Sequence, residues 1–261
     1  MTHSSGLATM NDGASIAWSL DGPEGRPVLM LSNSLGTSRA MWQPQLSAFT
    51  ARYRVLRYDT RGHGQSAVTP GDYGLDRLGR DVVNLLDALG LDQVDFCGLS
   101  LGGMTGQWLG VFAPERVERL VLANTSAFMG PPAGWQDRMH HVRADGMAAI
   151  ADAVVARWFT PAFAGSPATA EVLQSLLGTD PAGYTGCCAA IRDMDLRRII
   201  PLIDRPTLVI SGLQDPATPP EHAALIHQAI ADSALVSLDA SHLSNIEQPE
   251  AFTEAVLAFL G

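Results

Sequence analysis

Residues 94–104 read VDFCGLSLGGM, an apolar run followed by a serine held between two glycines. The run from Val94 has the length and composition of a buried strand, and the segment GGMTGQWLGVFA that follows the serine is typical of a helix. A sharp turn from strand to helix lifts a serine hydroxyl above the sheet, and flanking glycines remove side chains that would collide there. We therefore interpret Ser100, between Gly98 and Gly102, as a nucleophile. An isolated match to this pattern is more often a serine in a glycine-rich turn.

Five further apolar runs of strand length lie before and after this turn in the sequence. All are rich in Val, Leu and Ile without strict alternation, which predicts strands covered on both faces. They are VLMLS from Val28, YRVLRYD from Tyr53, RLVLANT from Arg119, TLVISG from Thr207 and ALVSLD from Ala234. Helical patterns such as LDRLGRDVVNLLDALG from Leu75 lie between them, so the chain predicts a mostly parallel sheet flanked by helices. Near the start, LATM and SIAWSL should pair through the turn NDGA as an antiparallel edge.

The alternation of strand and helix stops from about residue 129 to residue 201. Residues 136–158 and 168–198 look helical there and are punctuated by Pro, Gly and Trp. Open α/β sheets bind ligands at the carboxyl ends of their strands, where such an insertion would lie. We therefore predict an α/β core of residues 1–128 and 202–261, with a helical cap of residues 129–201 over the carboxyl edge of the sheet.

Composition excludes several classes of function. The 261 residues carry 27 acidic and 17 basic side chains, a formal charge of -10, which gives no attraction to nucleic acid or to an anionic membrane. The start, MTHSSGLATMNDG, has no targeting pattern and no apolar run approaches membrane-spanning length, so we expect a soluble cytoplasmic protein. Three cysteines form neither a disulfide framework nor a zinc pattern, and no metal is expected. The sequence does not decide between a monomer and a homo-oligomer.

A serine nucleophile needs a base, and the base needs an acid that orients it. Asp215 follows TLVISGLQ and His242 follows ALVSLDAS, so each should lie just past the carboxyl end of a strand. His63, in DTRGHGQS, precedes the nucleophile among glycines and is better explained as stabilising a turn. Asp239 should still lie on its strand and point into the packing of the sheet. Four further histidines fall on expected helices and should face solvent or cap them: His140, His141, His222 and His227.

Together these segments resemble the α/β-hydrolase superfamily over essentially the whole chain. DTRGHGQS at 59–66 is similar to a D-x-R-G-x-G-x-S turn of many members, and GLQDPATP and ASHLSNIEQPEAF are similar to their acid and histidine segments. The loop at 32–36 reads SNSLG where many members have a His-Gly pair. This loop, the cap stretch WQDRMHHVRADGMAAIADAVVARWFTPAF and YTGCCAAIRDMDLR from Tyr184 resemble the 3-oxoadipate enol-lactonases of aromatic-acid catabolism.

The resemblance implies a catalytic triad of Ser100, Asp215 and His242, with the backbone amides of Leu35 and Leu101 as the oxyanion hole. It also implies an anionic lactone as substrate and no metal or organic cofactor. Such a substrate on an acidic protein needs a local cation, for which the cap offers Arg138, Arg143, Arg157 and Arg192.

Among these arginines we favour Arg138, which lies near Trp135 at the entry of the cap. Trp135 and Trp158 would line the apolar part of the pocket or pack in the core. Asn33 and Ser34 would bind substrate or only shape their loop.

Other functions fit the same residues. A general carboxylesterase, a cofactor-free perhydrolase, a hydrolase of carbon-carbon bonds and an acyltransferase could all use this triad. Dehalogenases of this fold have an aspartate where this chain has Ser100. A ligand-binding receptor that kept a hydrolase pocket is the alternative from another class, and slow turnover would distinguish it from a metabolic enzyme.

Overall fold

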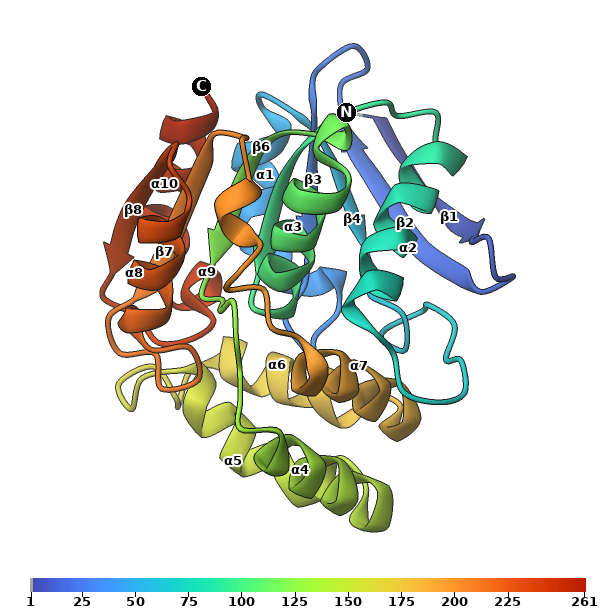
Figure 1. The fold of residues 1–261 in the computed structure, drawn as a ribbon, viewed down its shortest axis with the longest axis vertical. Coiled ribbons are helices and arrows are strands. Elements are labelled where there is room, and N and C mark those ends of the chain that lie inside the picture. Colours follow the sequence, from blue (N-terminus) through green and yellow to red (C-terminus); the bar gives the residue numbers. More distant parts are fainter. Residues whose placement is uncertain (1) are drawn as a thin grey trace.

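An eight-stranded sheet forms the centre of the molecule, in the order β1-β2-β4-β3-β5-β6-β7-β8 (Figure 1). The computed structural model describes residues 2–261. All pairs from β4 to β8 are parallel, whereas β1 and β2 are antiparallel to their neighbours. The strands are β1 Thr2–Thr9, β2 Ser15–Gly22, β3 Val28–Ser32, β4 Arg54–Tyr58, β5 Val94–Leu99, β6 Val117–Ala123, β7 Thr207–Gly212 and β8 Ser233–Leu238. The predicted mostly parallel sheet is confirmed.

The amino-terminal hairpin is also confirmed. Strands β1 and β2 pair in the register Leu7 to Ala17 and Ala8 to Ile16, with the turn of NDGA between them. Gly13 lies at φ +84°, a conformation that favours glycine, and the Asp12 carboxylate accepts a hydrogen bond from the amide of Ala14 at 3.1 Å. This turn places Asp12 beside Arg61 and Arg77, at 2.9 and 3.7 Å.

Burial on both faces holds for the inner strands but not for β8. Every residue of β5 and β7 is buried. In β8 Ala234, Leu235 and Ser237 are exposed, because this strand is the last in the sheet and pairs only with β7. The prediction that the run ALVSLD is covered on both faces was therefore wrong, since period alone does not distinguish an edge strand from an inner one.

Helices cover both faces of the sheet. In Figure 1, α2, α3 and α8 lie on one face and α1 and α10 on the other. Helix α2 buries Leu78, Val82, Leu85 and Leu86, the stripe that its sequence predicts. These helices are α1 Gln43–Thr50, α2 Leu75–Ala88, α3 Leu101–Phe112, α8 Pro220–Ala229 and α10 Pro249–Leu260, with a one-turn helix α9, Ser244–Glu247, before α10.

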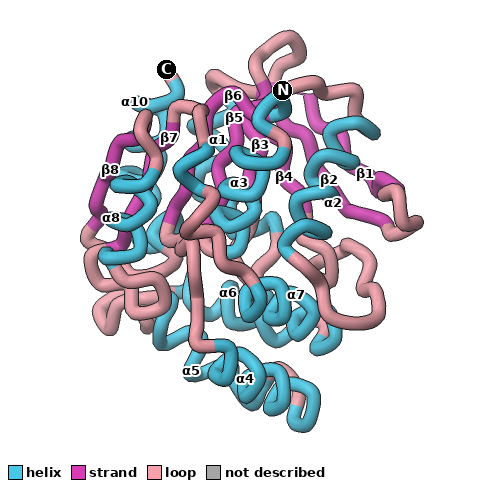
Figure 2. The backbone as a smooth tube through the Cα atoms, in the orientation of Figure 1, coloured by secondary structure: helices cyan, strands magenta, loops and turns pink. Residues whose placement is uncertain are grey.

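Four further helices lie between β6 and β7 and cover the carboxyl ends of the parallel strands (Figures 1 and 2). They are α4 Pro132–Asp145, α5 Ala148–Trp158, α6 Pro167–Leu177 and α7 Pro181–Asp193. Helix α4 packs on α7 and on α5, and α5 packs on α6. The division into a core and a cap at residues 129 and 201 stays a prediction. None of the helices within residues 2–261 is long and apolar enough to span a membrane.

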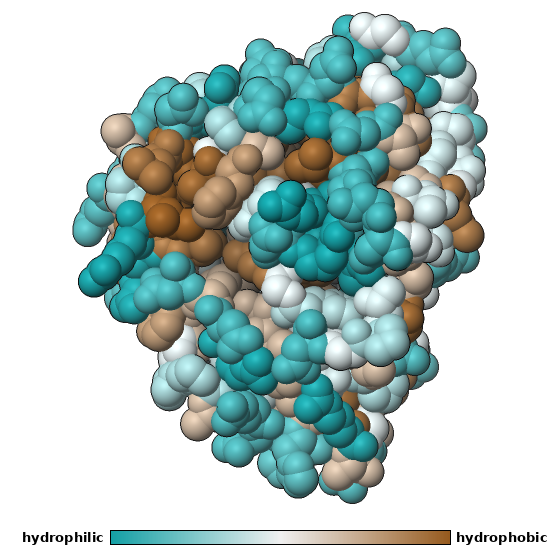
Figure 3. Space-filling model, turned by 45° about the vertical axis from the view of Figure 1, so that its right-hand side comes forward, coloured by the Kyte–Doolittle hydropathy of each residue, from teal (hydrophilic) through white to brown (hydrophobic). Residues whose placement is uncertain are grey.

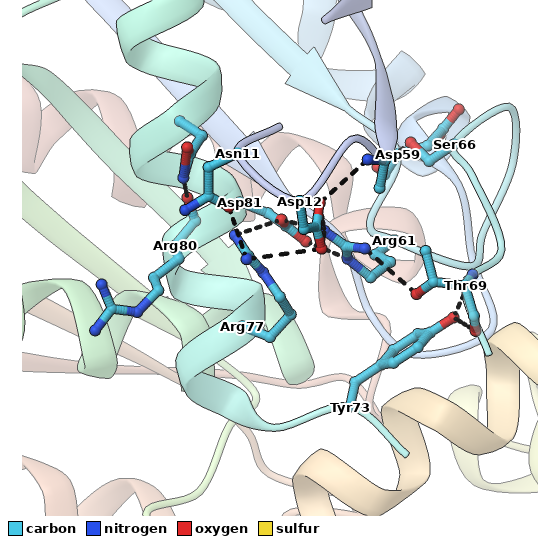
Figure 4. Close-up of polar contacts among 12 residues, drawn as sticks. Asn11, Asp12, Asp59, Arg61, Ser66, Thr69, Tyr73, Arg77, Arg80 and Asp81 are labelled. Carbon is cyan, nitrogen blue, oxygen red and sulfur yellow. Dashed lines mark hydrogen bonds and ion pairs between the residues drawn. The ribbon is translucent and has the colours of Figure 1, made fainter. Parts of the chain in front are cut away.

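A cluster of charges joins the hairpin to α2 (Figure 4). The fully buried guanidinium of Arg61 forms two hydrogen bonds with Asp81 of α2, at 2.7 and 2.6 Å, and an ion pair with Asp12 at 2.9 Å. Arg77 of α2 also reaches Asp81, at 3.0 Å. The DTRGHGQS segment thus ties the hairpin turn, the loop after β4 and α2 together.

Candidate active site

Ser100 occupies a sharp turn between β5 and α3. Its backbone lies at φ 58° and ψ -114°, and it is one of two non-glycine residues with positive φ among residues 2–261. The glycines are needed because a Cβ on Gly98 would lie 2.1 Å from the carbonyl oxygen of Gly102, and one on Gly102 would lie 2.2 Å from that of Ser32. The amide of Ser100 donates to the carbonyl of Ala123 at 2.9 Å, which fixes the strained turn to β6.

Asp215 and His242 form a buried pair beyond the ends of β7 and β8. His242 Nδ1 lies 2.8 Å from Asp215 Oδ2. Asp215 also accepts hydrogen bonds from the amides of Ala217 and Thr218, at 2.8 and 2.9 Å, and from the Thr218 hydroxyl at 2.7 Å. Burial acts to raise the pKa of Asp215, but His242 and the Thr218 donors outweigh it and hold that pKa below its usual value. The carboxylate is therefore ionised at neutral pH.

A further residue, Asn124, supports this pair and was not found from the sequence. It follows β6 and is the other non-glycine residue with positive φ, at 44°. Its amide group donates to Asp215 Oδ2 and to the carbonyl of Ser241, both at 3.1 Å, and its oxygen accepts from the Ser244 hydroxyl at 2.6 Å. Only its place just after the run RLVLA could have indicated it. Asn124 links the acid loop to the histidine loop.

Ser100 and His242 line one cavity of about 440 Å³ between the core and the four inserted helices. The core contributes Ser34, Leu35 and Thr218 as well. The inserted helices and the segment before them contribute Met129, Trp135, Arg138, Val154, Arg157, Trp158, Tyr184 and Ile191. The structure thus brings six of the residues predicted for the site to the wall of this cavity: Ser34, Leu35, Ser100, Trp135, Arg138 and His242.

The loop of residues 32–37 carries the backbone amide of Leu35 beside this cavity. The amide of Ser34 donates to Met41 Sδ at 3.4 Å, that of Gly36 to His63 Nε2 at 2.9 Å and that of Thr37 to the Ser34 carbonyl at 3.2 Å. The Leu35 amide has no acceptor within the described residues. The amide of Leu101, at the start of α3, likewise has none there. Free donors at a helix amino terminus favour negative charge.

Asn33 does not reach the cavity. Its side chain is fully buried, donates to the Tyr58 carbonyl at 2.7 Å and accepts from Trp42 Nε1 at 2.9 Å. Its carbonyl accepts the Gly102 amide at 3.0 Å, next to the serine turn. Of the two roles open to Asn33, the structure supports shaping the loop.

The four candidate arginines separate into two pairs. Arg143 and Arg192 both contact Asp72, at 2.9 and 3.2 Å. Arg138 and Arg157 line the cavity, and neither forms an ion pair with a carboxylate anywhere in residues 2–261. Burial and the charge of Arg138 lower the pKa of Arg157. Two neighbouring guanidinium groups without a carboxylate partner are chemically suited to bind an anion.

The alternative acid and base lie elsewhere. His63 is buried and accepts the Gly36 amide, so it supports the loop that carries Leu35 in addition to its own turn. Burial lowers the pKa of His63, which favours the neutral ring that this contact needs. Asp239 is exposed and accepts from Gln214 at 2.7 Å. The expectation that Asp239 points into the sheet was wrong, because β8 ends one residue before it.

Metal ligands do not cluster in the described part of the chain. Residues 2–261 hold no group of three or more His, Cys, Asp or Glu side chains that could bind a metal ion. Cys97, Cys187 and Cys188 are buried free thiols.

Known proteins resemble this chain over nearly its full length. Residues 27–149 match a family described as alpha/beta hydrolase fold, and residues 187–261 match one described as TAP-like protein. The chain is 46% identical over 241 residues to 3-oxoadipate enol-lactonase 2 of Acinetobacter baylyi, which covers 92% of this chain and 90% of the relative. Identity to 3-oxoadipate enol-lactonase 1 of the same bacterium is 39%, over 97% and 96% of the two chains. The solved structure of the enol-lactonase from Burkholderia xenovorans LB400 matches with a TM-score of 0.96 at 44% identity, over 98% and 99% of the chains.

Proposed function

The chain belongs to the α/β-hydrolase family and is a carboxylic ester hydrolase, and from this premise we propose that it opens the lactone ring of 3-oxoadipate enol-lactone to give 3-oxoadipate. The observation that carries the proposal is one cavity that Ser100 and His242 share, with Asp215 2.8 Å behind the histidine. The named activity of the two enol-lactonase relatives supports the choice of substrate. We place the reaction in the cytoplasm and in the catabolism of aromatic compounds.

In the first step Ser100 Oγ attacks the lactone carbonyl while His242 accepts the hydroxyl proton. Asp215 holds the His242 proton on Nδ1, which leaves the other ring nitrogen free to act as the base. The carbonyl oxygen becomes an oxyanion, for which the unpaired amides of Leu35 and Leu101 are the donors. Collapse of this intermediate breaks the bond to the ring oxygen, and His242 returns its proton to that oxygen.

The second step releases the acid. The leaving oxygen of a lactone stays tethered to the acyl group and can close the ring again, unlike the alcohol of an open ester. In an enol-lactone the released enol tautomerises to a ketone, which removes this nucleophile and drives the opening forward. Water, activated by His242, then attacks the acyl-enzyme, and Ser100 leaves with the proton of the histidine. These two steps use the side chains and backbone amides of the chain, the lactone and one water molecule.

The proposed substrate carries one free carboxylate in addition to the lactone. Arg138 and Arg157 are the two cations on the cavity wall that lack a carboxylate partner in residues 2–261, and we assign the carboxylate to them. Trp135, Trp158 and Ser34 would contact the remainder of the ring. This assignment adds Arg157 to Arg138, the arginine favoured from the sequence.

The decisive experiment follows ring opening of 3-oxoadipate enol-lactone by ultraviolet absorbance at neutral pH, with the wild type and Ser100→Ala side by side. We expect the wild type to turn over many times per second and the variant to lose at least about 10⁴-fold in kcat, because no other nucleophile lines the cavity in this position. Ser126→Ala is the matched control, since Ser126 donates to the Phe128 carbonyl away from the cavity. Its kcat should equal that of the wild type.

An aryl acetate serves as the reference ester. If only the aryl acetate is hydrolysed and Ser100→Ala abolishes this, the protein is a general carboxylesterase and the lactone assignment fails. If neither compound is turned over, the ligand-binding alternative replaces the proposal. If Ser100→Ala retains the activity, the serine mechanism itself is refuted.

A further inference from the structure

Glu247 is a buried carboxylate without a cation. It ends the one-turn helix α9, five residues after His242, and its side chain has an exposed fraction of only 8%. Within residues 2–261 no arginine or histidine forms an ion pair with it; its partners are the Ser241 amide at 2.9 Å, the Thr160 amide at 3.2 Å and the Thr160 hydroxyl. A buried charge is costly unless several donors satisfy it, so these contacts are the reason that the site tolerates a carboxylate.

The contacts of Glu247 join two segments that are far apart in the sequence. Thr160 follows α5 in the inserted helices, whereas Ser241 directly precedes His242. The Ser241 hydroxyl donates to the carbonyl of Arg157 at 3.0 Å. The amide of Leu243, directly after His242, donates to the carbonyl of Trp158 at 3.0 Å. Residues on both sides of His242 are therefore bonded to the end of α5.

The end of α5 is also a wall of the cavity. The side chains of Arg157 and Trp158 line it, while their carbonyls hold the residues beside His242. The hydrogen-bond contacts of the imidazole ring both lie at Nδ1, which is 2.8 Å from Asp215 Oδ2 and 3.3 Å from the Thr218 hydroxyl. Within residues 2–261 the other ring nitrogen has no hydrogen-bond partner, so the direction in which it points depends on where the backbone of residues 241–243 is held.

We propose that Glu247 and Thr160 are positioning residues that clamp the backbone of His242 to the end of α5 and so set the distance between the imidazole and Ser100. This role rests on the proposed serine mechanism and adds to it a part for the inserted helices. The inserted helices would then do more than cover the cavity and bind the substrate carboxylate. The carboxyl end of α5 would also hold the backbone on both sides of the catalytic base.

The test compares Thr160→Val, which removes the hydroxyl at nearly constant volume, with Thr160→Ser, which keeps it, and with Glu247→Gln. Two substrates are used, the enol-lactone and an aryl acetate that has no carboxylate for the arginines. We expect Thr160→Val and Glu247→Gln to lower kcat about tenfold for both substrates while KM changes less than about twofold, because a small displacement of a general base slows proton transfer without affecting binding. Thr160→Ser should restore most of kcat.

Two controls make the outcome specific. Thr253→Val removes a hydroxyl that bonds within α10, to the Pro249 carbonyl, and should leave kcat unchanged. Ser241→Ala removes only the bond to Arg157 and should lower kcat by a smaller factor, which keeps the proposal testable if Glu247→Gln does not fold.

An unchanged kcat for both substrates, with or without a lower melting temperature, would show that Glu247 and Thr160 only stabilise the fold. An effect on the lactone alone, or on KM alone, would show that they shape the substrate pocket and would also overturn the proposal. Ser100→Ala is assayed in the same series. If it retains turnover the serine mechanism fails, whereas an inactive Ser100→Ala with an unaffected Thr160→Val refutes the clamp only.

Discussion

Two arginines of the inserted helices, Arg138 and Arg157, line the cavity and have no carboxylate partner within residues 2–261. Arg138 stacks on Trp135, with the guanidinium carbon 4.6 Å from the ring centroid, and Arg157 lies close enough for the two charges to repel. A repulsive pair of this kind costs stability when the site is empty and is relieved when a carboxylate lies between them. The structure distinguishes the four candidate arginines by their partners, since Arg143 pairs with Asp72 and Arg192 pairs with Asp72 and Asp193.

Replacing either cavity arginine should weaken binding of the lactone selectively. For Arg138→Met and Arg157→Met we expect the KM for 3-oxoadipate enol-lactone to rise about tenfold or more, since a charge-assisted hydrogen bond is worth about 1.5–3 kcal/mol. The KM for an aryl acetate should change little. Steady-state kinetics on both substrates measure the difference, with Arg143→Met as the matched control because that arginine pairs with Asp72 outside the cavity. Equal KM values in all three variants would remove the arginines from the substrate site.

At the scale of elements, close packing of α2 on α3 depends on a glycine. A Cβ on Gly79 of α2 would lie 2.0 Å from the ring of Trp108 in α3. That ring is largely buried and packs on Phe112 with centroids 5.4 Å apart, so it has little room to move. Glycine therefore serves here to bring two helices together beside the serine turn, although it is a poor helix former.

Gly79→Ala and Gly134→Ala should change stability in opposite directions. Alanine is the better helix former by up to about 1 kcal/mol, and this gain should appear at Gly134 in α4, where nothing lies within 4 Å of a new Cβ. At Gly79 overpacking should exceed that gain and lower the free energy of unfolding by about 1–3 kcal/mol. Urea denaturation of both variants measures the two effects. A Gly79→Ala protein as stable as Gly134→Ala would mean that α2 and α3 move apart at no cost.

At the scale of the whole molecule, the face drawn in Figure 3 is mostly hydrophilic, with its broadest apolar patch at the upper left. The described chain is acidic, and its most buried cation, Arg61, lies between three segments that are distant in sequence. Burial raises the pKa of Asp81 even though Arg61 and Arg77 lower it. The cluster of Figure 4 therefore balances a buried carboxylate against a buried guanidinium.

Arg61→Met should destabilise the protein in a pH-dependent way. Removing Arg61 leaves the buried carboxylate of Asp81 with only the partly exposed Arg77 as a cation, so the cost at neutral pH should approach that of a broken buried ion pair, about 3–5 kcal/mol. Without Arg61 the pKa of Asp81 rises further above its unfolded value of 3.8, so the folded variant binds a proton more tightly than the unfolded chain does. The variant should recover stability as the pH falls from 7 toward 5.

Urea denaturation of Arg61→Met at pH 7 and pH 5 measures this recovery. Arg80→Met is the control on the same helix, because Arg80 pairs with Asp76 in solvent and its loss should leave the free energy of unfolding nearly unchanged. If Arg61→Met lowers the free energy of unfolding equally at both pH values, the loss does not come from an ionised Asp81 that has lost its main cation.

The sequence by itself determined which segments form strands, that most of these strands are parallel, that helices are inserted between two of them, and that Ser100 lies in a turn. Each of these rests on local physics: apolar runs of strand length, the helical period of α2, and glycines that a turn at Ser100 requires. The positions of Asp215 and His242 just past strands followed from the same pattern. The sequence prediction was wrong for β8, which has the apolar pattern of a buried strand but lies partly exposed at the edge of the sheet.

Only the tertiary structure decided which side chains meet. Asn124 reaches Asp215 across 91 positions of sequence, and Glu247 reaches Thr160 across 87. The sequence favoured Arg138 among four arginines, and only the structure shows that Arg157 lines the cavity as well, while Arg143 and Arg192 pair with Asp72. Periodicity reports which face of an element is apolar but carries no information on its partner, because long-range contacts depend on how the packed elements are placed in space.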